Sequence, residues 1–150
     1  NALVFLDDEG FEWNHDINKI VNLLRVRNIP CVVANTDKSY PVSDDKVSIA
    51  IGGIADMVKR ITGRMFIRFG KPSAQMFIFA YEHSQRAQEV GKQNILMVGD
   101  TLCTDIIGGN KFGIDTALVM TGNTLRSTVE EQIYLTGIVP DFICQSAVID

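Results

Sequence analysis

The sequence has few of the residues that build disulfide frameworks or zinc sites. Its three cysteines, Cys31, Cys103 and Cys144, lie far apart, and its two histidines are isolated. No Cys-x-x-Cys pair and no Cys/His cluster is present, so neither a disulfide scaffold nor a structural zinc site is predicted. Free thiols are typical of a reducing compartment, and we therefore expect a cytoplasmic protein.

Long apolar runs and an excess of basic residues are also missing. No apolar stretch approaches the roughly 20 residues of a membrane-spanning helix, so no membrane partner is expected. The 14 basic and 18 acidic side chains give a net charge of −4, which argues against general electrostatic affinity for nucleic acid. A small anionic ligand is still compatible with this balance, because it needs only local positive charge.

The 150 residues instead alternate short apolar runs with amphipathic stretches. Apolar runs bounded by turn residues predict strands, and apolar positions three or four residues apart predict helices. The predicted strands are 2–6, 31–34, 65–69, 95–98, 116–120 and 142–143, and the predicted helices are 16–27, 52–62, 72 to about 90, 104–112 and 128–135. Residues 35–41 are expected to form a polar loop and 43–46 a surface turn, while 47–51 are ambiguous. The alternation predicts an α/β fold with parallel sheets, in two successive segments joined near residues 64–69.

Two carboxylates follow the apolar run 95–98. Asp100 comes directly after the strand and its glycine turn, and Asp105 lies at the start of the next helix. Ligands of parallel α/β sheets bind beyond the carboxyl ends of the strands, and paired acids there suit a hard cation such as Mg²⁺. An equally good interpretation is that Asp100 caps a turn and Asp105 caps a helix.

Lys71 is the second informative position. Pro72 is expected in the first turn of the following helix, which places Lys71 at a helix N-terminus where the macrodipole is already positive. A cation there needs an anion nearby, either a phosphate or the carboxylates of a metal site. The alternative is an exposed lysine beside a turn.

Weaker signals come from a polar loop and from a cysteine. Asn35, Thr36 and Asp37 follow a predicted strand, where recognition residues often lie, but all three are also ordinary turn formers. Cys103 lies between the two acids, yet no histidine is near it in the sequence to activate it as a nucleophile. We expect it to be a small filler of the core.

In combination these segments resemble a family. Gly70-Lys71-Pro72, then Val98-Gly99-Asp100-Thr101-Leu102-Cys103-Thr104-Asp105, then Gly113-Ile114-Asp115-Thr116-Ala117-Leu118-Val119-Met120-Thr121-Gly122 resemble the C-terminal half of a haloacid dehalogenase (HAD) superfamily phosphatase. The NagD-like, p-nitrophenyl phosphatase-like branch, subfamily IIA, is the most similar. Ala34-Asn35-Thr36-Asp37 and the following Tyr40-Pro41 are similar to a loop in the cap domain of that branch.

The resemblance implies a division of labour. Residues 1–66 would be the latter half of an α/β cap, and residues 67–150 the C-terminal half of a Rossmann-like parallel-sheet core. Lys71 would be the catalytic lysine, Asp100 and Asp105 would serve the Mg²⁺ site, and Asn35, Thr36 and Asp37 would bind the substrate. The implied activity is Mg²⁺-dependent hydrolysis of a small phosphorylated metabolite, such as a sugar phosphate or a p-nitrophenyl phosphate-like ester.

One part of the family pattern has no good match. The nucleophile belongs to an Asp-x-Asp motif, and Asp7-Asp8-Glu9-Gly10 imitates it only superficially because Glu9 replaces the second aspartate. We therefore expect a fragment of a longer phosphatase that lacks the nucleophile and is inactive by itself. Unpaired strand edges in such a fragment would favour a homo-oligomer. A non-catalytic phosphate- or metal-binding interaction module and, less well matched, a receiver-like domain remain as alternatives.

Overall fold

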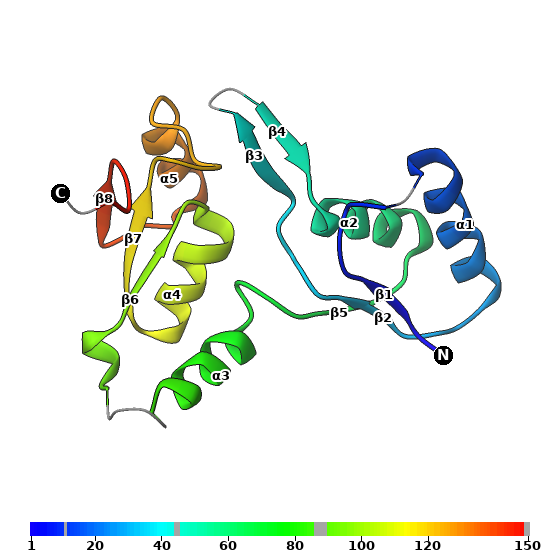
Figure 1. Cartoon of the computed structure of the whole chain (residues 1–150), viewed down its shortest axis with the longest axis horizontal. Helices are drawn as coiled ribbons and strands as arrows, with labels where there is room; N and C mark the ends of the chain where they lie inside the picture. The colour runs from blue at the N-terminus through cyan, green and yellow to red at the C-terminus, as the bar shows by residue number, and fades with distance from the viewer. Residues whose placement is uncertain (11, 44–45, 86–89, 149–150) are drawn as a thin grey trace. The chain divides into compact units, whose positions relative to one another are not determined.

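The computed structural model describes residues 1–10, 12–43, 46–85 and 90–148, and the chain divides into two compact units (Figure 1). Unit 1 comprises Asn1–Tyr40 and Val47–Gly70, and unit 2 comprises Pro41–Lys46 and Lys71–Asp150. The assignment of residues 1–66 to a cap and 67–150 to a core stays a prediction.

Unit 1 is built on a three-stranded parallel sheet in the order β1-β2-β5. The strands are β1 (Leu3–Phe5), β2 (Cys31–Val33) and β5 (Phe66–Arg68), with Leu3 opposite Cys31 and Cys31 opposite Phe66. Helices α1 (Trp13–Val26) and α2 (Ile51–Thr62) pack against each other, and α2 also packs on β1 and β2. Their apolar faces close a core with the sheet, which contains Phe5, Ile17, Leu24, Val33, Ile54, Ala55, Val58 and Phe66 among others.

The bounds of both helices have local causes. α1 begins at Trp13, three residues before the predicted Asp16, because the Asp16 carboxylate reaches back and accepts the N–H of Glu12 at 2.9 Å. That hydrogen bond, helped by His15, also lowers the pKa of Asp16. α2 ends at Gly63, whose φ of 68° lies in the left-handed region that glycine adopts without strain.

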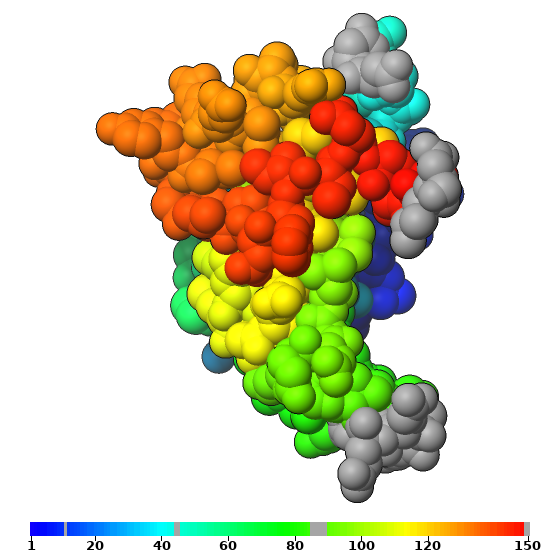
Figure 2. Space-filling view, turned by 90° about the vertical axis from the view of Figure 1, so that its left-hand side faces the viewer, coloured from blue at the N-terminus to red at the C-terminus, as the bar shows by residue number. Residues whose placement is uncertain are grey.

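Unit 2 holds a second three-stranded parallel sheet in the order β6-β7-β8. Its strands are β6 (Leu96–Gly99), β7 (Asp115–Val119) and β8 (Phe142–Cys144), and its helices are α3 (Ala74–Gln85), α4 (Ile107–Phe112) and α5 (Val129–Thr136). A 3-10 turn (Lys92–Asn94) precedes β6, and a π-helical segment (Leu102–Ile106) precedes α4. The buried cluster Leu102, Ile106, Leu118 and Val129 joins these elements. Figure 2 shows the surface formed by α5 and the C-terminal residues, where Tyr134 and Leu135 are exposed.

Most of the predicted elements are confirmed, as is the α/β fold with parallel sheets. The polar loop prediction is wrong in part, because β3 (Ser39–Ser43) occupies its second half and pairs with β4 (Lys46–Ile49), which resolves the ambiguous stretch as extended. Residues 44–45 of the predicted turn and 86–89 of the predicted long helix lie outside the described residues. Among the described residues, no helix is long and apolar enough to cross a membrane.

Candidate functional site

The buried carboxylate of Asp105 is the centre of a polar cluster in unit 2. Its residue is only 1% exposed, and its Oδ2 accepts the N–H groups of Asp100 at 3.1 Å and Thr101 at 3.0 Å. Its Oδ1 lies 2.6 Å from the ammonium nitrogen of Lys71. Burying a charge is costly unless it is paired and hydrogen-bonded, and Asp105 satisfies both conditions.

The chain turns at Gly99 in a way that admits this carboxylate. A Cβ at Gly99 would overlap the Cβ and the carboxyl group of Asp105, so only glycine fits where β6 ends. The N–H of Asp105 in turn bonds to the carbonyl oxygen of Thr101 at 2.9 Å, which closes the segment onto itself. The sequence Gly99-Asp100-Thr101 is thereby wrapped around the side chain that lies four residues further along.

Lys71 approaches Asp105 from the segment between β5 and α3. The helix begins at Ala74 and not at Pro72, so the expectation that Pro72 lies in its first turn is wrong; residues 71–72 belong to a turn that precedes the helix. The Lys71 side chain is 31% exposed, so one side of it faces solvent while its ammonium group contacts Asp105. The carboxylate of Asp105 is an anion beside the lysine, although Lys71 lies three residues before the first residue of α3.

Asp100 is half-buried and is held on both of its carboxylate oxygens. Its Oδ1 accepts the hydroxyl of Thr101 at 3.1 Å, and its Oδ2 accepts the backbone N–H of Asn123 at 2.7 Å. Its own carbonyl oxygen accepts the N–H of Thr124 at 3.0 Å. The structure therefore brings Lys71, Asp100 and Asp105 together in unit 2.

The turn after β7 also belongs to this site, which was not predicted from the sequence. Gly122 lies so close to Asp100 that a Cβ there would overlap the carboxylate, and the Asn123 side-chain amide donates to Thr101 Oγ1 at 3.0 Å. The predicted strand order could have indicated this turn. Because β7 runs parallel to β6, the turn after β7 must lie at the same edge of the sheet as the turn after β6. Thr121-Gly122-Asn123-Thr124 stands at that position.

The donor set suits a cation that needs few protein ligands. Among the described residues no group of three or more His, Cys, Asp or Glu side chains could hold a metal ion. Asp105 Oδ2 accepts two backbone N–H groups and its buried Oδ1 contacts the Lys71 ammonium, whereas each oxygen of the half-buried Asp100 accepts one hydrogen bond and keeps a second lone pair. Mg²⁺ is usually bound by one or two carboxylates, with waters and substrate phosphates completing its shell. Asp100 fits such a ligand, and Asp105 fits the role of organising the loop beside it.

The predicted substrate-binding residues Asn35, Thr36 and Asp37 lie in unit 1, directly after β2. Asn35 Oδ1 accepts the N–H of Asp37 at 2.9 Å, which is a local turn of the kind that asparagine favours. α2 supports this loop from behind: Gly52 donates to the Asp37 carbonyl at 3.1 Å, and a Cβ at Gly52 would overlap the loop backbone. Their role towards a substrate stays a prediction.

Cys103 is exposed, so the expectation that it fills the core is wrong. It lies within the π-helical segment, in which Leu102, Thr104, Asp105 and Ile106 are the buried residues. The apolar side of the segment is thus supplied by Leu102 and Ile106.

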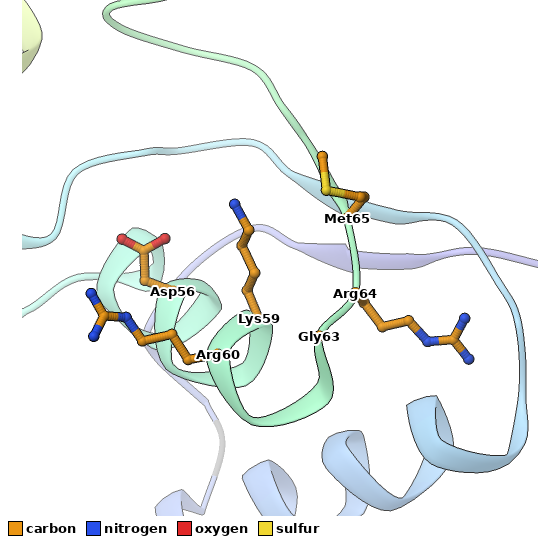
Figure 3. A pocket seen from close by; sticks show the side chains of 6 residues that line it. All are labelled: Asp56, Lys59, Arg60, Gly63, Arg64 and Met65. Atoms are coloured by element: carbon orange, nitrogen blue, oxygen red, sulfur yellow. The ribbon is translucent and has the colours of Figure 1, made fainter.

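Unit 1 also has a surface hollow of about 420 Å³ at the C-terminal end of α2 (Figure 3). It is lined by Asp56, Lys59, Arg60, Gly63, Arg64 and Met65. The Arg64 side chain points away from α2 and donates to carbonyl oxygens at the end of α1, and Asp56 forms an ion pair with Arg68. Because its acid and one of its cations already serve structural contacts, we assign no functional site to it.

Comparison with known proteins identifies the family of the chain. A family model described as HAD-hydrolase-like matches residues 68–147, which is more than half of the chain. Mouse chronophin is 33% identical over 145 residues, covering 93% of this chain and 47% of its own length. A crystal structure from Cytophaga hutchinsonii, described as a possible sugar phosphatase of the HAD superfamily, is 63% identical with a TM-score of 0.91, covering 100% of this chain and 53% of that one.

A more distant structure has the same fold. The 4-nitrophenylphosphatase of Thermotoga maritima is 26% identical with a TM-score of 0.72, and the match covers 95% of this chain and 51% of that one. The chain spans about half the length of the curated relatives it matches. The chain belongs to the HAD superfamily, in subfamily IIA with the NagD-like and p-nitrophenyl phosphatase-like proteins.

Proposed function

We propose that this chain supplies the lysine and the cation-binding acid of a Mg²⁺-dependent phosphatase that hydrolyses a small phosphorylated metabolite. The observation that carries the proposal is the contact of Lys71 with the buried Asp105, whose other oxygen fixes the backbone of Asp100. Family membership supports it, as do the names of relatives that act as phosphatases. A sugar phosphate or a p-nitrophenyl phosphate-like ester is the substrate class that those names favour.

The chemistry of phosphoryl transfer suits these side chains. The transition state spreads negative charge over the equatorial oxygens, so catalysis consists mainly of positioning and charge stabilisation. Lys71 has a partly exposed side chain, and its ammonium group, held by Asp105, can place positive charge against a phosphoryl oxygen. A bound Mg²⁺ would neutralise charge on the same group, and Asp100 would hold it. In unit 1, Asn35, Thr36 and Asp37 would contact the substrate.

We further propose that the nucleophile lies outside these 150 residues. The sequence contains no Asp-x-Asp motif. Asp7, the superficial match, follows β1 in unit 1, is exposed, and accepts the N–H of Asp8 at 2.7 Å. The chain by itself should then hydrolyse p-nitrophenyl phosphate with Mg²⁺ at no more than the background rate. Robust Mg²⁺-dependent turnover that Asp7→Asn abolishes would overturn this part of the proposal.

Cation binding tests the proposal directly on the chain. We expect Mg²⁺ titrated into the chain to give a binding isotherm by calorimetry, and Asp100→Asn to abolish it. Asp115→Asn is the matched control, because Asp115 is an exposed acid at the start of β7 in the same unit and should not matter. Absence of binding to the unsubstituted chain, or equal loss in both variants, would contradict the assignment.

We also propose that the chain forms a homo-oligomer. Within the described part of the chain, β6 pairs only with β7, and its Leu96 and Val98 are 48% and 44% exposed. A strand with an unpaired edge and apolar side chains is a template for pairing with another strand. Size-exclusion chromatography with light scattering should show a species larger than the monomer, and a clean monomer at all concentrations would refute the idea.

A further inference from the structure

We propose that Thr101, Gly122 and Asn123 act together as positioning residues that set the direction of the Asp100 carboxylate and thereby the cation affinity of the site. We call these three residues the Asp100 clamp. The inference rests on the proposed function, because it takes Asp100 as the cation ligand. It goes beyond that function by assigning a role to the turn after β7, which the ligand assignment alone does not need.

The clamp is a closed ring of hydrogen bonds. The backbone N–H of Asn123 donates to Asp100 Oδ2 at 2.7 Å, and the hydroxyl of Thr101 donates to Asp100 Oδ1 at 3.1 Å. The side-chain amide of Asn123 then donates to Thr101 Oγ1 at 3.0 Å, which returns to the starting residue. Both carboxylate oxygens are therefore tied to the same asparagine, one directly and one through the threonine.

The direction of each hydrogen bond follows from the groups involved. An ionised carboxylate can only accept, so the single hydrogen of the Thr101 hydroxyl must point to Asp100. The hydroxyl oxygen can then only accept from Asn123, which places the NH₂ group of the amide on that side. The Oδ1 of Asn123 is buried and has no hydrogen-bond donor among the described residues. A leucine at position 123 is similar in size to asparagine but could not donate to Thr101.

Gly122 makes the close approach that the ring requires. A Cβ on this residue would overlap Asp100 Oδ2 itself, so any side chain would push the carboxylate away from the Asn123 N–H. The turn is anchored on its other side by the hydrogen bond from the Thr124 N–H to the Asp100 carbonyl at 3.0 Å. The turn thus holds Asp100 at two points, because the Asn123 N–H binds its carboxylate and the Thr124 N–H binds its backbone carbonyl, while Gly122 leaves room for the carboxylate.

Fixing a ligand in this way changes its affinity for a cation. Groups that orient a metal ligand without touching the metal typically alter affinity about 10-fold to 100-fold when they are removed. Each oxygen of Asp100 uses one lone pair within the clamp, and the remaining lone pairs keep a defined direction. Without the clamp, the side chain could rotate and the same carboxylate would bind less tightly.

The test measures Mg²⁺ and Mn²⁺ affinity of the whole 150-residue chain by calorimetry. Thr101→Val keeps the shape of threonine without the hydroxyl, and we expect about 10-fold weaker binding, whereas Thr101→Ser should restore nearly full affinity. Asn123→Leu removes the amide donor without adding a charge and should weaken binding at least as much as Thr101→Val. Circular dichroism checks that the variants are folded, and a shift of the Asn123 backbone amide resonance in the unsubstituted chain on Mg²⁺ addition reports the clamp without any substitution.

The outcomes separate the clamp from the proposed function. If Asp100→Asn abolishes binding while Thr101→Val and Asn123→Leu bind as the unsubstituted chain does, the clamp is refuted and the ligand assignment stands. Equal weakening by Thr101→Val and Thr101→Ser would also refute it, because the hydroxyl would then not be the cause. If the unsubstituted chain binds neither cation, the proposed function fails, and the clamp fails with it.

Discussion

Arg64 and Lys71 stand seven residues apart on either side of β5, and the two units use them differently. In unit 1 the Arg64 guanidinium donates to the carbonyl oxygens of Leu24, at 2.8 Å, and Arg27, at 2.9 Å, and to the side chain of Asn28. In unit 2 the Lys71 ammonium contacts the buried carboxylate of Asp105. Both side chains are half-buried, so exposure alone does not distinguish them.

The difference lies in their partners. Arg64 satisfies carbonyl groups that are left without partners at the end of α1, a task that a flat guanidinium with several donors performs well. Lys71 meets an ionised group that is itself buried, an arrangement that costs desolvation energy and is a weak source of stability. A basic residue that neutralises a buried acid at a strand end is therefore the better functional candidate, and the following substitutions test that distinction.

Removing the buried acid should have the largest effect. Asp105→Ala leaves the N–H groups of Asp100 and Thr101 without an acceptor and Lys71 without its carboxylate, and we expect a loss of about 3–5 kcal/mol in unfolding free energy. Urea unfolding followed by circular dichroism measures it, with the exposed Asp115→Ala as the control within about 0.5 kcal/mol. A loss below about 1 kcal/mol would show that the carboxylate is not essential to the loop.

Removing the lysine should cost less. Lys71→Met deletes the ammonium group, but Asp105 keeps two backbone N–H donors, so we expect a loss of about 1.5–3 kcal/mol. The same urea titration at low and high salt should show a smaller loss at high salt, because the lysine is partly exposed to solvent. A loss equal to that of Asp105→Ala would mean that the ion pair, and not the backbone contacts, holds the site together.

The contribution of Arg64 to stability should depend on the shape of its side chain as much as on its charge. Arg64→Lys retains the charge but replaces the planar fork with a single ammonium, so we expect a loss of about 1 kcal/mol. Arg60→Lys is the control, since Arg60 is an exposed residue in the last turn of α2 and should change stability by less than about 0.5 kcal/mol. Thermal unfolding of both variants measures the loss. If Arg64→Lys is as stable as Arg60→Lys, the positive charge of Arg64 is sufficient and its planar guanidinium is not required.

Differences in reactivity among the three cysteines are the smallest of the expected effects. Burial raises the pKa of the Cys31 thiol, whereas Cys103 and Cys144 are exposed. A thiol reagent at pH 8 should therefore modify Cys103 and Cys144 quickly and Cys31 only slowly.

Because its folded pKa lies above the unfolded value of about 8.5, Cys31 contributes stability below that pH and loses it as the pH rises further. Cys31→Ala should remove that part of the alkaline loss.

The sequence predicted the parts of the fold that depend on local patterns. The amphipathic spacing of α1 and α2 and the apolar runs of β1, β2, β6 and β7 are strong signals, and the structure confirms them. The strand β3 was missed because Pro41 interrupts it and nearly all of its residues are exposed, so its pairing with β4 leaves no apolar pattern. The start of α1 was missed because it depends on a contact between a side chain and the backbone of Glu12.

The charged residues of the candidate site could be predicted from the sequence, but the residues that position Asp100 could not. Lys71, Asp100 and Asp105 stand at strand ends, where residue type and position together draw attention. Gly122 acts through the absence of a side chain, and Asn123 acts through its backbone N–H and its side-chain amide. Glycine and asparagine are also ordinary turn residues, so their residue types alone do not mark these positions. Their importance depends on the pairing of β6 with β7, which brings the two turns together.

The overlap that any side chain at position 122 would create with Asp100 has a practical consequence for protein engineering. The segments 99–105 and 121–124 are separate in the sequence, yet each carries atoms whose positions the other dictates. A graft between relatives that exchanges one segment alone would combine parts shaped for different neighbours. The two segments should be transplanted as one cassette, and the strand register that joins them should be left unchanged.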